Sequence, residues 1–339
     1  DDDNVELCRY AADALGEIGS AQAIPKLVSS LTSSSGDLRD TAVQALVKIG
    51  NEAVDELIGL LRHESAHGRL HAADALGRLG DARSFDALVS ALDDPDPRVR
   101  HYAAEALGKV GHVDVQRAVR SLLPLLKEKH RDIRSVAINA LRDLGGPVAV
   151  EALSDMLDDS NAMVRLQAAQ ALLELEDPAA VEPLVHGLRD SEWSVRAFCA
   201  EALGKLGSEK AVIPLILSAA DEKAAVKAKV IEALGKLGDS RSRHALEIAE
   251  KDLDGDVREA ARVALGRVRT AVGDPSPTGP VRERPSRRLD DDLDGFDDED
   301  GAPLLGADLD DDDEEDEDEP AAEDEEPWAD DDDDAADAF

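Results

Sequence analysis

Aromatic residues are scarce in this chain, with four Phe, two Tyr and two Trp among 339 residues. A hydrophobic core must therefore be built from Leu, Val, Ile and Ala. The two cysteines are too few for a disulfide framework, which favours a reducing compartment. No stretch approaches the roughly 18 uncharged apolar residues that a membrane span requires, and no signal segment opens the chain. The composition predicts a cytoplasmic protein that does not enter a membrane.

Basic residues are also in short supply, with 38 Lys and Arg against 76 Asp and Glu. Residues 271–339 alone hold 31 of the acidic residues and only 4 of the basic ones. Repulsion from phosphate argues against a nucleic-acid partner. The acidic composition, with 26 Arg to 12 Lys, resembles that of proteins from salt-loving archaea. We expect a halophilic, haloarchaeal protein whose self-repulsion is screened by salt, and an ordinary acidic protein with an acidic tail is the alternative.

The dominant pattern is an internal repeat of 30 to 34 residues. Segments such as AEALGKVG and IEALGKLG share a leucine, called the anchor here, which always follows an alanine. The anchors are Leu15, Leu46, Leu76, Leu107, Leu141, Leu172, Leu203, Leu234 and Leu265. A second leucine column lies nineteen residues before the anchor, at Leu27, Leu57, Leu88, Leu122, Leu153, Leu184, Leu215 and Leu246. Two such columns predict a repeated pair of helices, with a leucine of the first near the Ala-Leu pair of the second.

Two polar columns accompany the anchors. Capping residues stand eleven positions before it, at Asn4, Ser35, Ser65, Asp96, Asn161 and Asp254, and predict where the second helices begin. Seven positions before the anchor is a basic column of Arg39, Arg69, Arg100, Arg134, Arg165, Arg196, Lys227 and Arg258, which Cys8 interrupts. We interpret this basic column as a ladder that bonds turn carboxylates and carbonyls between repeats, rather than as catalytic residues.

Units such as DDPDPRVRHYAAEALGKVG and DSEWSVRAFCAEALGKLG resemble HEAT repeats of the phycobilisome-lyase type. The resemblance covers about residues 1–270 and implies an all-α, right-handed α-solenoid with nine second helices and eight complete helix pairs. The first unit lacks its first helix, so either the start is trimmed or a single helix caps the array. Three extra residues in GHVDVQRAV, between Leu107 and Leu122, either alter the curvature or form a neutral loop.

Residues 271–339 differ in kind, because PSPTGP, RERPSRR and long Asp/Glu runs cannot bury a core. We predict a disordered acidic tail. Its apolar residues are either short docking motifs or scattered residues of a solvated segment. They are Phe296, Leu304, Leu305, Trp328 and Phe339.

Several histidines raise the question of chemistry. Residues 63–67 read HExxH, but Ser65 is a helix cap inside the motif, so we expect the geometry of a zinc protease to fail. His67 and His71, with His101 in the next unit, either share a metal or are an exposed pair, and we favour the pair. The repeat also resembles deoxyhypusine hydroxylase, whose iron binds His-Glu dyads, yet Tyr102 stands where the dyad of the next unit needs Glu. We expect no enzyme, cofactor or metal; a metal-dependent hydroxylase or a bilin lyase is the alternative.

Helical spacing predicts an exposed stripe on the second helices, six and two residues before the anchor and two after it. Stacked stripes form the concave surface that solenoids use for binding. Leu70 falls on this stripe, four aromatic or histidine residues stand one position beside it, and Trp193 occupies a turn and is expected to be exposed. The candidate protein-binding residues are Tyr10, His71, Asp74, Arg78, His101, Tyr102, Glu105, Lys109, Trp193, Phe198, Glu201 and Lys205.

The predicted function is that of a monomeric protein–protein interaction scaffold, with other proteins as its partners. Proteins that this chain resembles in salt-loving archaea include adaptors between the chemotaxis machinery and the archaellum. The resemblance therefore implies a role in taxis signalling.

Overall fold

The computed structural model describes residues 5–271, so Asn4 and the predicted acidic tail after Ala271 lie outside them. This part contains nine long and eight short α-helices and no strand. The long helices are α1 (Val5–Ile18), α3 (Gly36–Ile49), α5 (Ala66–Leu79), α7 (Pro97–Val110), α9 (Arg131–Leu144), α11 (Ala162–Glu174), α13 (Trp193–Leu206), α15 (Ala224–Leu237) and α17 (Gly255–Ala271). The short ones are α2 (Ile24–Ser30), α4 (Val54–Leu60), α6 (Phe85–Ala91), α8 (Val115–Leu122), α10 (Pro147–Asp155), α12 (Val181–Gly187), α14 (Val212–Ser218) and α16 (Arg243–Ala249).

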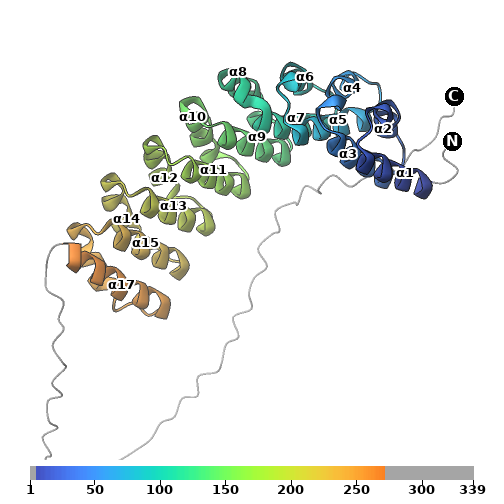
Figure 1. The fold of residues 1–339 in the computed structure, drawn as a ribbon. Helices are drawn as coiled ribbons and strands as arrows, with labels where there is room; N and C mark the ends of the chain where they lie inside the picture. Colours follow the sequence, from blue (N-terminus) through green and yellow to red (C-terminus); the bar gives the residue numbers. More distant parts are fainter. Residues whose placement is uncertain (1–4, 272–339) are drawn as a thin grey trace, which may run out of the picture. The chain divides into compact units, whose positions relative to one another are not determined.

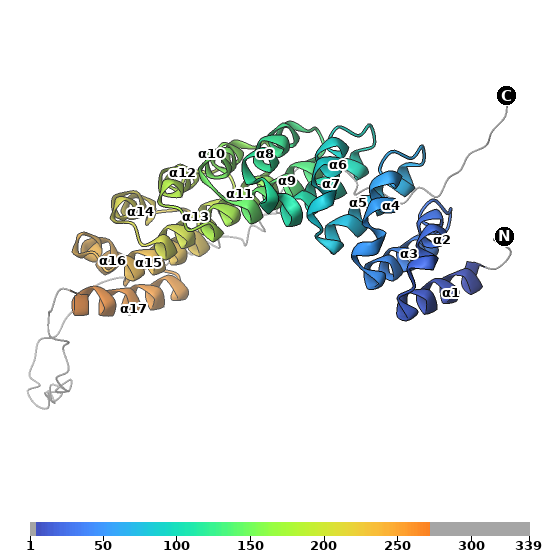
Figure 2. The same ribbon diagram turned by 45° about the horizontal axis from the view of Figure 1, so that its top comes forward.

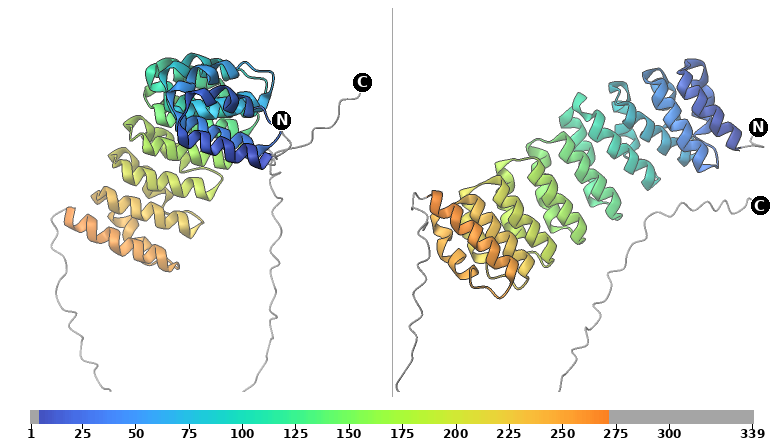
Figure 3. Two further views of the ribbon diagram at one scale, coloured as in Figure 1. Left: turned by 45° about the vertical axis from the view of Figure 1, so that its right-hand side comes forward. Right: turned by 60° about the horizontal axis from the view of Figure 1, so that its bottom comes forward.

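The short and long helices alternate along the chain and form two layers of one solenoid (Figures 1 and 2). Each short helix packs on the long helix that follows it, and each long helix packs on the next long helix. Within residues 5–271 the row curves, with the long helices on its inner side and the short helices on its outer side (Figures 1 and 3). The all-α solenoid expected from the repeat is confirmed. The inner surface formed by the long helices is called the inner face below.

The helix starts follow the capping column. Ser35 and Ser65 accept hydrogen bonds from the backbone N–H groups of Leu38 and Gly68, both at 3.4 Å. Asp96, Asn161 and Asp254 do the same for their own helices. These caps satisfy donors that the first helical turn leaves free. The five capping predictions that fall on described residues are confirmed.

The core is built from the two leucine columns. Leucines nineteen residues before the anchor are at most 2% exposed in all eight short-helix units. The alanine before the anchor is 0–2% exposed in the eight units from α3 to α17. Small and branched aliphatic side chains therefore supply most of this core, to which Phe85, 5% exposed, adds an aromatic ring. One position of the stripe was predicted wrongly: Leu70 is 5% exposed, because its apolar side chain packs inward from α5 instead of facing solvent.

The distance between neighbouring long helices depends on the residue that follows the anchor. In five of the eight long helices that precede another, this residue is a glycine. A Cβ added to it would lie 2.6–3.1 Å from an atom of the alanine on the next long helix. The glycines are Gly16 in α1, Gly77 in α5, Gly108 in α7, Gly204 in α13 and Gly235 in α15. These five helix pairs have the most extensive contact between backbones. Val47, Arg142 and Leu173 occupy the same position in α3, α9 and α11, whose contacts with the next long helix are less extensive. A glycine after the anchor therefore lets the two long helices approach closely, and a side chain at this position keeps them further apart.

The basic column forms the predicted ladder. The Nη1 atom of Arg196 donates to the carbonyls of Asp190 and Ser191 in the turn before its own helix, at 2.9 and 3.1 Å. Its Nε and Nη2 atoms donate to the carboxylate of Asp221 in the next unit, at 2.8 and 3.0 Å. Equivalent rungs join Arg69 to Asp94, Arg100 to Glu128, Arg134 to Asp159, Arg165 to Asp190 and Lys227 to Asp252. The ladder interpretation is confirmed.

One rung has a different partner. His63 lies in the turn before α5, at the position where the later units have an acidic residue, so Arg39 finds no carboxylate there. Its Nε atom instead donates to Nε2 of His71 on α5, at 3.0 Å. The contact between α3 and α5 therefore includes a hydrogen bond to an imidazole, and it lacks the close glycine–alanine approach of other long-helix pairs.

The three extra residues lie between α7 and α8. The chain leaves α7 through a 3₁₀ turn, Gly111–Val113, and α8 begins at Val115, early enough to place Leu122 at its end. In six of the other short helices the leucine is the middle residue, and in α10 (Pro147–Asp155) Leu153 is the seventh of nine. The insertion is thus absorbed by extending the short-helix side of this unit.

Candidate protein-binding surface

All twelve candidate residues lie on the long helices. His71, Asp74 and Arg78 are on α5, and His101, Tyr102, Glu105 and Lys109 are on the adjacent α7. Phe198, Glu201 and Lys205 occupy the equivalent positions on α13. Two groups of residues therefore form on the inner face, separated by α9 and α11 (Figure 1).

The first group surrounds Tyr102, which is half-buried. Burial raises the pKa of its hydroxyl, and the negative charges of Asp74, Glu105 and Asp40 raise it further. The ring of His101 meets the Tyr102 ring edge-on, with centroids 5.5 Å apart. Burial also lowers the pKa of His101 in spite of the acidic Glu105 and Asp132 nearby. Three successive long helices, α3, α5 and α7, thus present one aromatic ring among carboxylates.

The charged residues of this group are paired along their own helices. Asp74 accepts from Nε of Arg78 at 2.8 Å, and Glu105 accepts from Nζ of Lys109 at 2.7 Å. Burial raises the pKa of Asp74, outweighing the Arg78 guanidinium, and Glu105 adds to the rise. Arg78 and Lys109 are exposed although each is paired with a carboxylate.

The second group includes one residue that sequence reasoning missed. Nζ of Lys205 lies 2.6 Å from Glu201, and the hydrogen bond lowers the pKa of that carboxyl. Lys229 of α15 reaches the same carboxylate at 3.5 Å. Lys229 stands five residues before its anchor, in the same column as Tyr10, His71, Tyr102 and Phe198, so this column was the signal that could have identified it.

Tyr10 and Trp193 lie apart from these groups. Tyr10 is 63% exposed on α1, with the guanidinium of Arg9 5.4 Å from its ring centroid. Trp193 is 45% exposed, as expected, but it is the first residue of α13 rather than part of the preceding turn.

The histidine motif adopts a turn and a helix start. His63 follows α4, and Ser65 caps α5, which begins at Ala66, so the predicted break inside HExxH is confirmed. Nδ1 of His63 accepts from the backbone N–H of Ser65 at 3.0 Å. His71 accepts from Arg39. Within residues 5–271 no group of three or more His, Cys, Asp or Glu side chains is placed to hold a metal ion.

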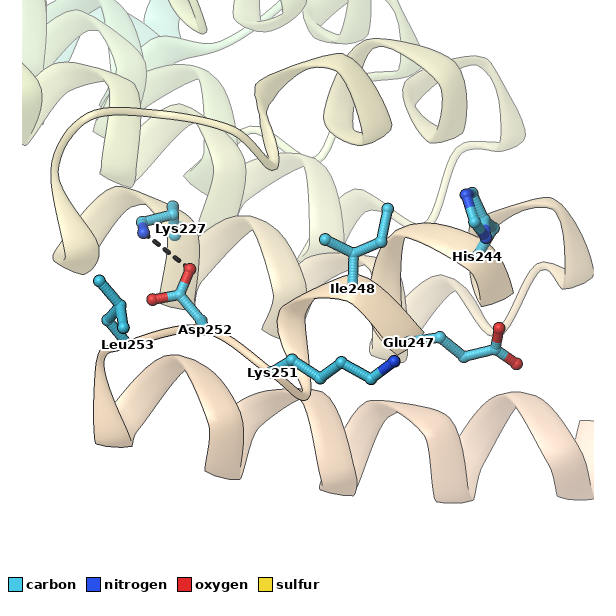
Figure 4. Close-up of a pocket in the computed structure, with 7 residues that line it drawn as sticks. All are labelled: Lys227, His244, Glu247, Ile248, Lys251, Asp252 and Leu253. Carbon is cyan, nitrogen blue, oxygen red and sulfur yellow. Dashed lines mark hydrogen bonds and ion pairs between the residues drawn. The ribbon is translucent and has the colours of Figure 1, made fainter. Parts of the chain in front are cut away.

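A shallow groove lies on the outer side of the last repeat (Figure 4). It is lined by Lys227, His244, Glu247, Ile248, Lys251, Asp252 and Leu253. Ile248 is 61% exposed and Leu253 is 99% exposed, while Lys227 and Asp252 form a rung of the ladder at 2.8 Å. The groove thus combines two exposed aliphatic side chains with an ion pair that already has a structural role.

None of the described helices is both long and apolar enough to cross a membrane. No curated protein matches the chain in sequence. Among solved structures, importin beta is similar with a TM-score of 0.57 and 16% identity, over 79% of this chain and 44% of importin beta. This likeness concerns the fold alone.

Two enzyme structures are more distant in shape. Human deoxyhypusine hydroxylase in complex with glycerol shares 26% identity over 76% of this chain and 99% of its own, with a TM-score of 0.34. The complex of CpcE and CpcF of phycocyanin lyase from Nostoc shares 26% identity over 45% of this chain and 99% of its own, with a TM-score of 0.42.

A family model described as HEAT repeats matches six overlapping stretches of the sequence. They are residues 1–68, 54–142, 85–173, 119–196, 150–225 and 181–266. Together they span nearly all of the described helices, and the paired helices, leucine columns and stacked layers fit this match. The chain belongs to the HEAT-repeat family.

Proposed function

We propose that this protein is a non-catalytic scaffold that binds partner proteins on its inner face. The observation that carries the proposal is the group around Tyr102, in which α3, α5 and α7 gather an aromatic ring, carboxylates and the exposed Arg78 and Lys109. Aromatic and arginine side chains are the residue types that most often dominate binding energy at protein interfaces. Stacked repeats hold such residues at fixed spacing along an extended surface.

A pull-down from native lysate at high salt tests this proposal. The variant Tyr102→Ala/Glu105→Ala/Lys109→Ala changes the inner face, and Glu247→Ala/Lys251→Ala is the matched control on the outer side. We expect the first variant to lose specific partners that wild type and control retain, with unchanged thermal melts. Equal capture by all three proteins would place the interface elsewhere, and the absence of any specific partner would contradict the scaffold.

The finer proposal is an adaptor in taxis signalling, in the cytoplasm of a salt-loving archaeon and acting as a monomer. It is supported by the acidic composition and by the resemblance of the repeats to such adaptors. If the protein is halophilic, its melting temperature rises with KCl in the molar range because salt screens the excess negative charge. A flat or falling melting temperature would contradict the halophilic origin without affecting the fold.

The competing proposal is a metalloenzyme or a lyase built on the same repeat. It is favoured only by the histidines of α5 and α7, since His67 and His71 are one turn apart and His101 is in the next long helix. Metal analysis of the purified protein separates the two proposals. Stoichiometric iron or zinc that is lost in His67→Ala/His71→Ala would overturn the scaffold.

A further inference from the structure

The contacts that join α9, α11 and α13 differ from those between most other long helices. The residue after the anchor is Arg142 in α9 and Leu173 in α11, where the closely packed pairs have a glycine. The backbones of α9 and α11, and of α11 and α13, accordingly contact each other less extensively than those of the glycine pairs. These two looser contacts follow one another in the middle of the described array (Figure 2). They lie between the candidate residues of α5 and α7 and those of α13.

Both contacts are firmly connected near the start of the long helices. Arg134 of α9 lies 2.8 Å from the carboxylate of Asp159, in the turn before α11. Arg165 of α11 donates to both carboxylate oxygens of Asp190, in the turn before α13, at 2.7 Å. These four side chains are only 7–12% exposed. Paired arginine–carboxylate hydrogen bonds fix geometry, so the two rungs hold the starts of the helices in place relative to one another.

The later ends of the same helices are connected more weakly. Arg142 follows Arg134 by eight residues, which is about 12 Å along a helix. Its Nε atom lies 3.3 Å from the carboxylate of Glu174 on α11. These two side chains are 28% and 44% exposed, so solvent and salt weaken their attraction. In α11 the corresponding residue is Leu173, whose aliphatic side chain cannot form an ion pair.

A buried polar atom on α11 also favours separation of these helices. The Oε1 atom of Gln167 is buried, and no described residue donates a hydrogen bond to it. A buried acceptor without a hydrogen bond destabilises the packed arrangement. Movement of α11 away from its neighbours would let water reach this atom, so the helices separate more easily here than at the glycine contacts.

We propose that α9, α11 and α13 form a hinge in the middle of the array. The rungs from Arg134 and Arg165 are the pivots, and the later ends of the three helices move apart and together about them. The helices on either side keep their own packing. The hinge thereby changes the distance between the group around Tyr102 and the group around Glu201, so the inner face adapts to partners of different size. This motion belongs to the chain itself and occurs without a partner.

Spin labels at one repeated position test the hinge by double electron–electron resonance. Arg78, Asp143 and Lys205 are exposed and stand two residues after the anchors of α5, α9 and α13. An α5–α9 label pair spans two glycine contacts, and the matched α9–α13 pair spans the two contacts without glycine. Each pair is introduced as two cysteines into the full chain with Cys8→Ser and Cys199→Ala. We expect the distance distribution of the α9–α13 pair to be about twofold wider or more.

Two variants connect this width to the residue after the anchor. Arg142→Gly/Leu173→Gly restores the glycine column and should narrow the α9–α13 distribution to that of the α5–α9 pair. Gly108→Arg gives α7 the residue of α9 and should widen the α5–α9 distribution. Circular dichroism checks that each variant is folded, and the comparison of the two label pairs in the otherwise unchanged chain requires neither variant.

Equal widths for the two label pairs would overturn the hinge. A wide α9–α13 distribution that persists in folded Arg142→Gly/Leu173→Gly would also overturn it, because the motion would then have another origin. These measurements involve no partner protein, so their failure leaves the scaffold proposal unaffected.

Discussion

A methyl group on Gly204 would lie 2.7 Å from the Cα atom of Ala233, so the absence of a side chain on α13 allows α15 to pack against its backbone. Replacing Gly204 with Ala must push the two helices apart. We expect Gly204→Ala to lower the free energy of unfolding by about 1–3 kcal/mol, as overpacked cores do. Urea unfolding followed by circular dichroism measures the change.

Gly266 is the matched control for this substitution. It follows the anchor of α17, where an added Cβ meets nothing within 4 Å. Alanine is favoured over glycine inside a helix by about 0.5–1 kcal/mol, so Gly266→Ala should stabilise the protein. If both variants shifted the midpoint in the same direction, close approach of the helices would not be the function of the glycine column.

The rung between Arg196 and Asp221 should carry more stability than a surface ion pair. The two side chains are 9% and 10% exposed, and removing the arginine leaves the carboxylate of Asp221 without its bidentate partner. We expect Arg196→Met to cost about 3 kcal/mol, in the range for breaking a buried pair. Chemical denaturation of this variant measures the loss.

Arg258 offers the comparison within the same column. It donates to the carbonyls of Asp252 and Leu253 in its own turn, and it belongs to the last long helix of the described array. Arg258→Met should therefore destabilise the protein less than Arg196→Met. Equal losses would assign the stability to the turn carbonyls alone.

The ladder also predicts how stability depends on pH. Burial acts to raise the pKa of Asp190 and of Asp221, but hydrogen bonds from Arg165 and Arg196 and from backbone N–H groups outweigh it, and both pKa values lie below normal. A lowered folded-state pKa contributes stability that is complete above the ordinary aspartate value, about 3.9, and is lost as the pH falls through the folded-state value.

We therefore expect the midpoint of urea unfolding to fall steeply below about pH 4. In Asp221→Asn the amide cannot titrate, so part of this acid dependence should disappear, while stability at pH 7 is reduced. Melts at a series of pH values test the difference in slope. An unchanged slope in Asp221→Asn would show that other carboxyls control acid unfolding.

Glu176 is the only residue other than glycine with a positive φ among residues 5–271, at 50°. It lies two residues after the end of α11, four residues after its anchor, as Gly80, Gly207 and Gly238 do at the ends of α5, α13 and α15. Glycine adopts this conformation without steric cost. We expect Glu176→Gly to raise the free energy of unfolding by about 0.5–1 kcal/mol, and Gly207→Glu, the reciprocal change, to lower it. Thermal denaturation of both variants decides the matter, and a loss of stability in Glu176→Gly would contradict it.

Thiol chemistry gives a probe of local opening. Burial raises the pKa of the Cys199 thiol to about 12, so it is protonated at neutral pH. Cys8 is partly exposed on α1. Iodoacetamide at pH 8 should modify Cys8 in the native protein and Cys199 only after denaturant is added, as intact mass and peptide mapping will show. Native labelling of Cys199 would indicate that α13 opens readily.

The period of the sequence was sufficient to predict the helices, their starts and the buried leucines, because each depends on residues within one unit. The sequence could predict that the basic column joins neighbouring repeats, but not which residue each arginine contacts. The acidic column that includes Asp94 and Asp221 repeats as regularly as the arginines, yet its distance from them in space becomes evident only when two units are stacked. His71 replaced a carboxylate as the partner of Arg39, which no periodicity indicates.

The candidate surface was harder to predict than the fold. Spacing placed Glu105 and Lys109 on the stripe correctly but treated Leu70 as exposed, since one helix considered alone does not reveal which of its margins contacts a neighbour. The grouping of Asp40, Asp74 and Tyr102 depends on the separation of α3, α5 and α7. That separation is determined by the residues after the anchors, whose meaning appears only in the packed array.

Each rung runs from an arginine to a carboxylate in the following unit. The two ends of any stretch of the array are therefore different, with a carboxylate facing the preceding unit and an arginine facing the following one. A chain cut in the turn between α13 and α14 would yield two fragments with matching ends. The first would present Arg196 and the uncovered backbone of Gly204, and the second would present Asp221 and Ala233. Such fragments have the complementary surfaces needed to reassemble without a covalent link. The same connection that stabilises the intact solenoid therefore makes the protein suited to splitting into two halves that recognise each other.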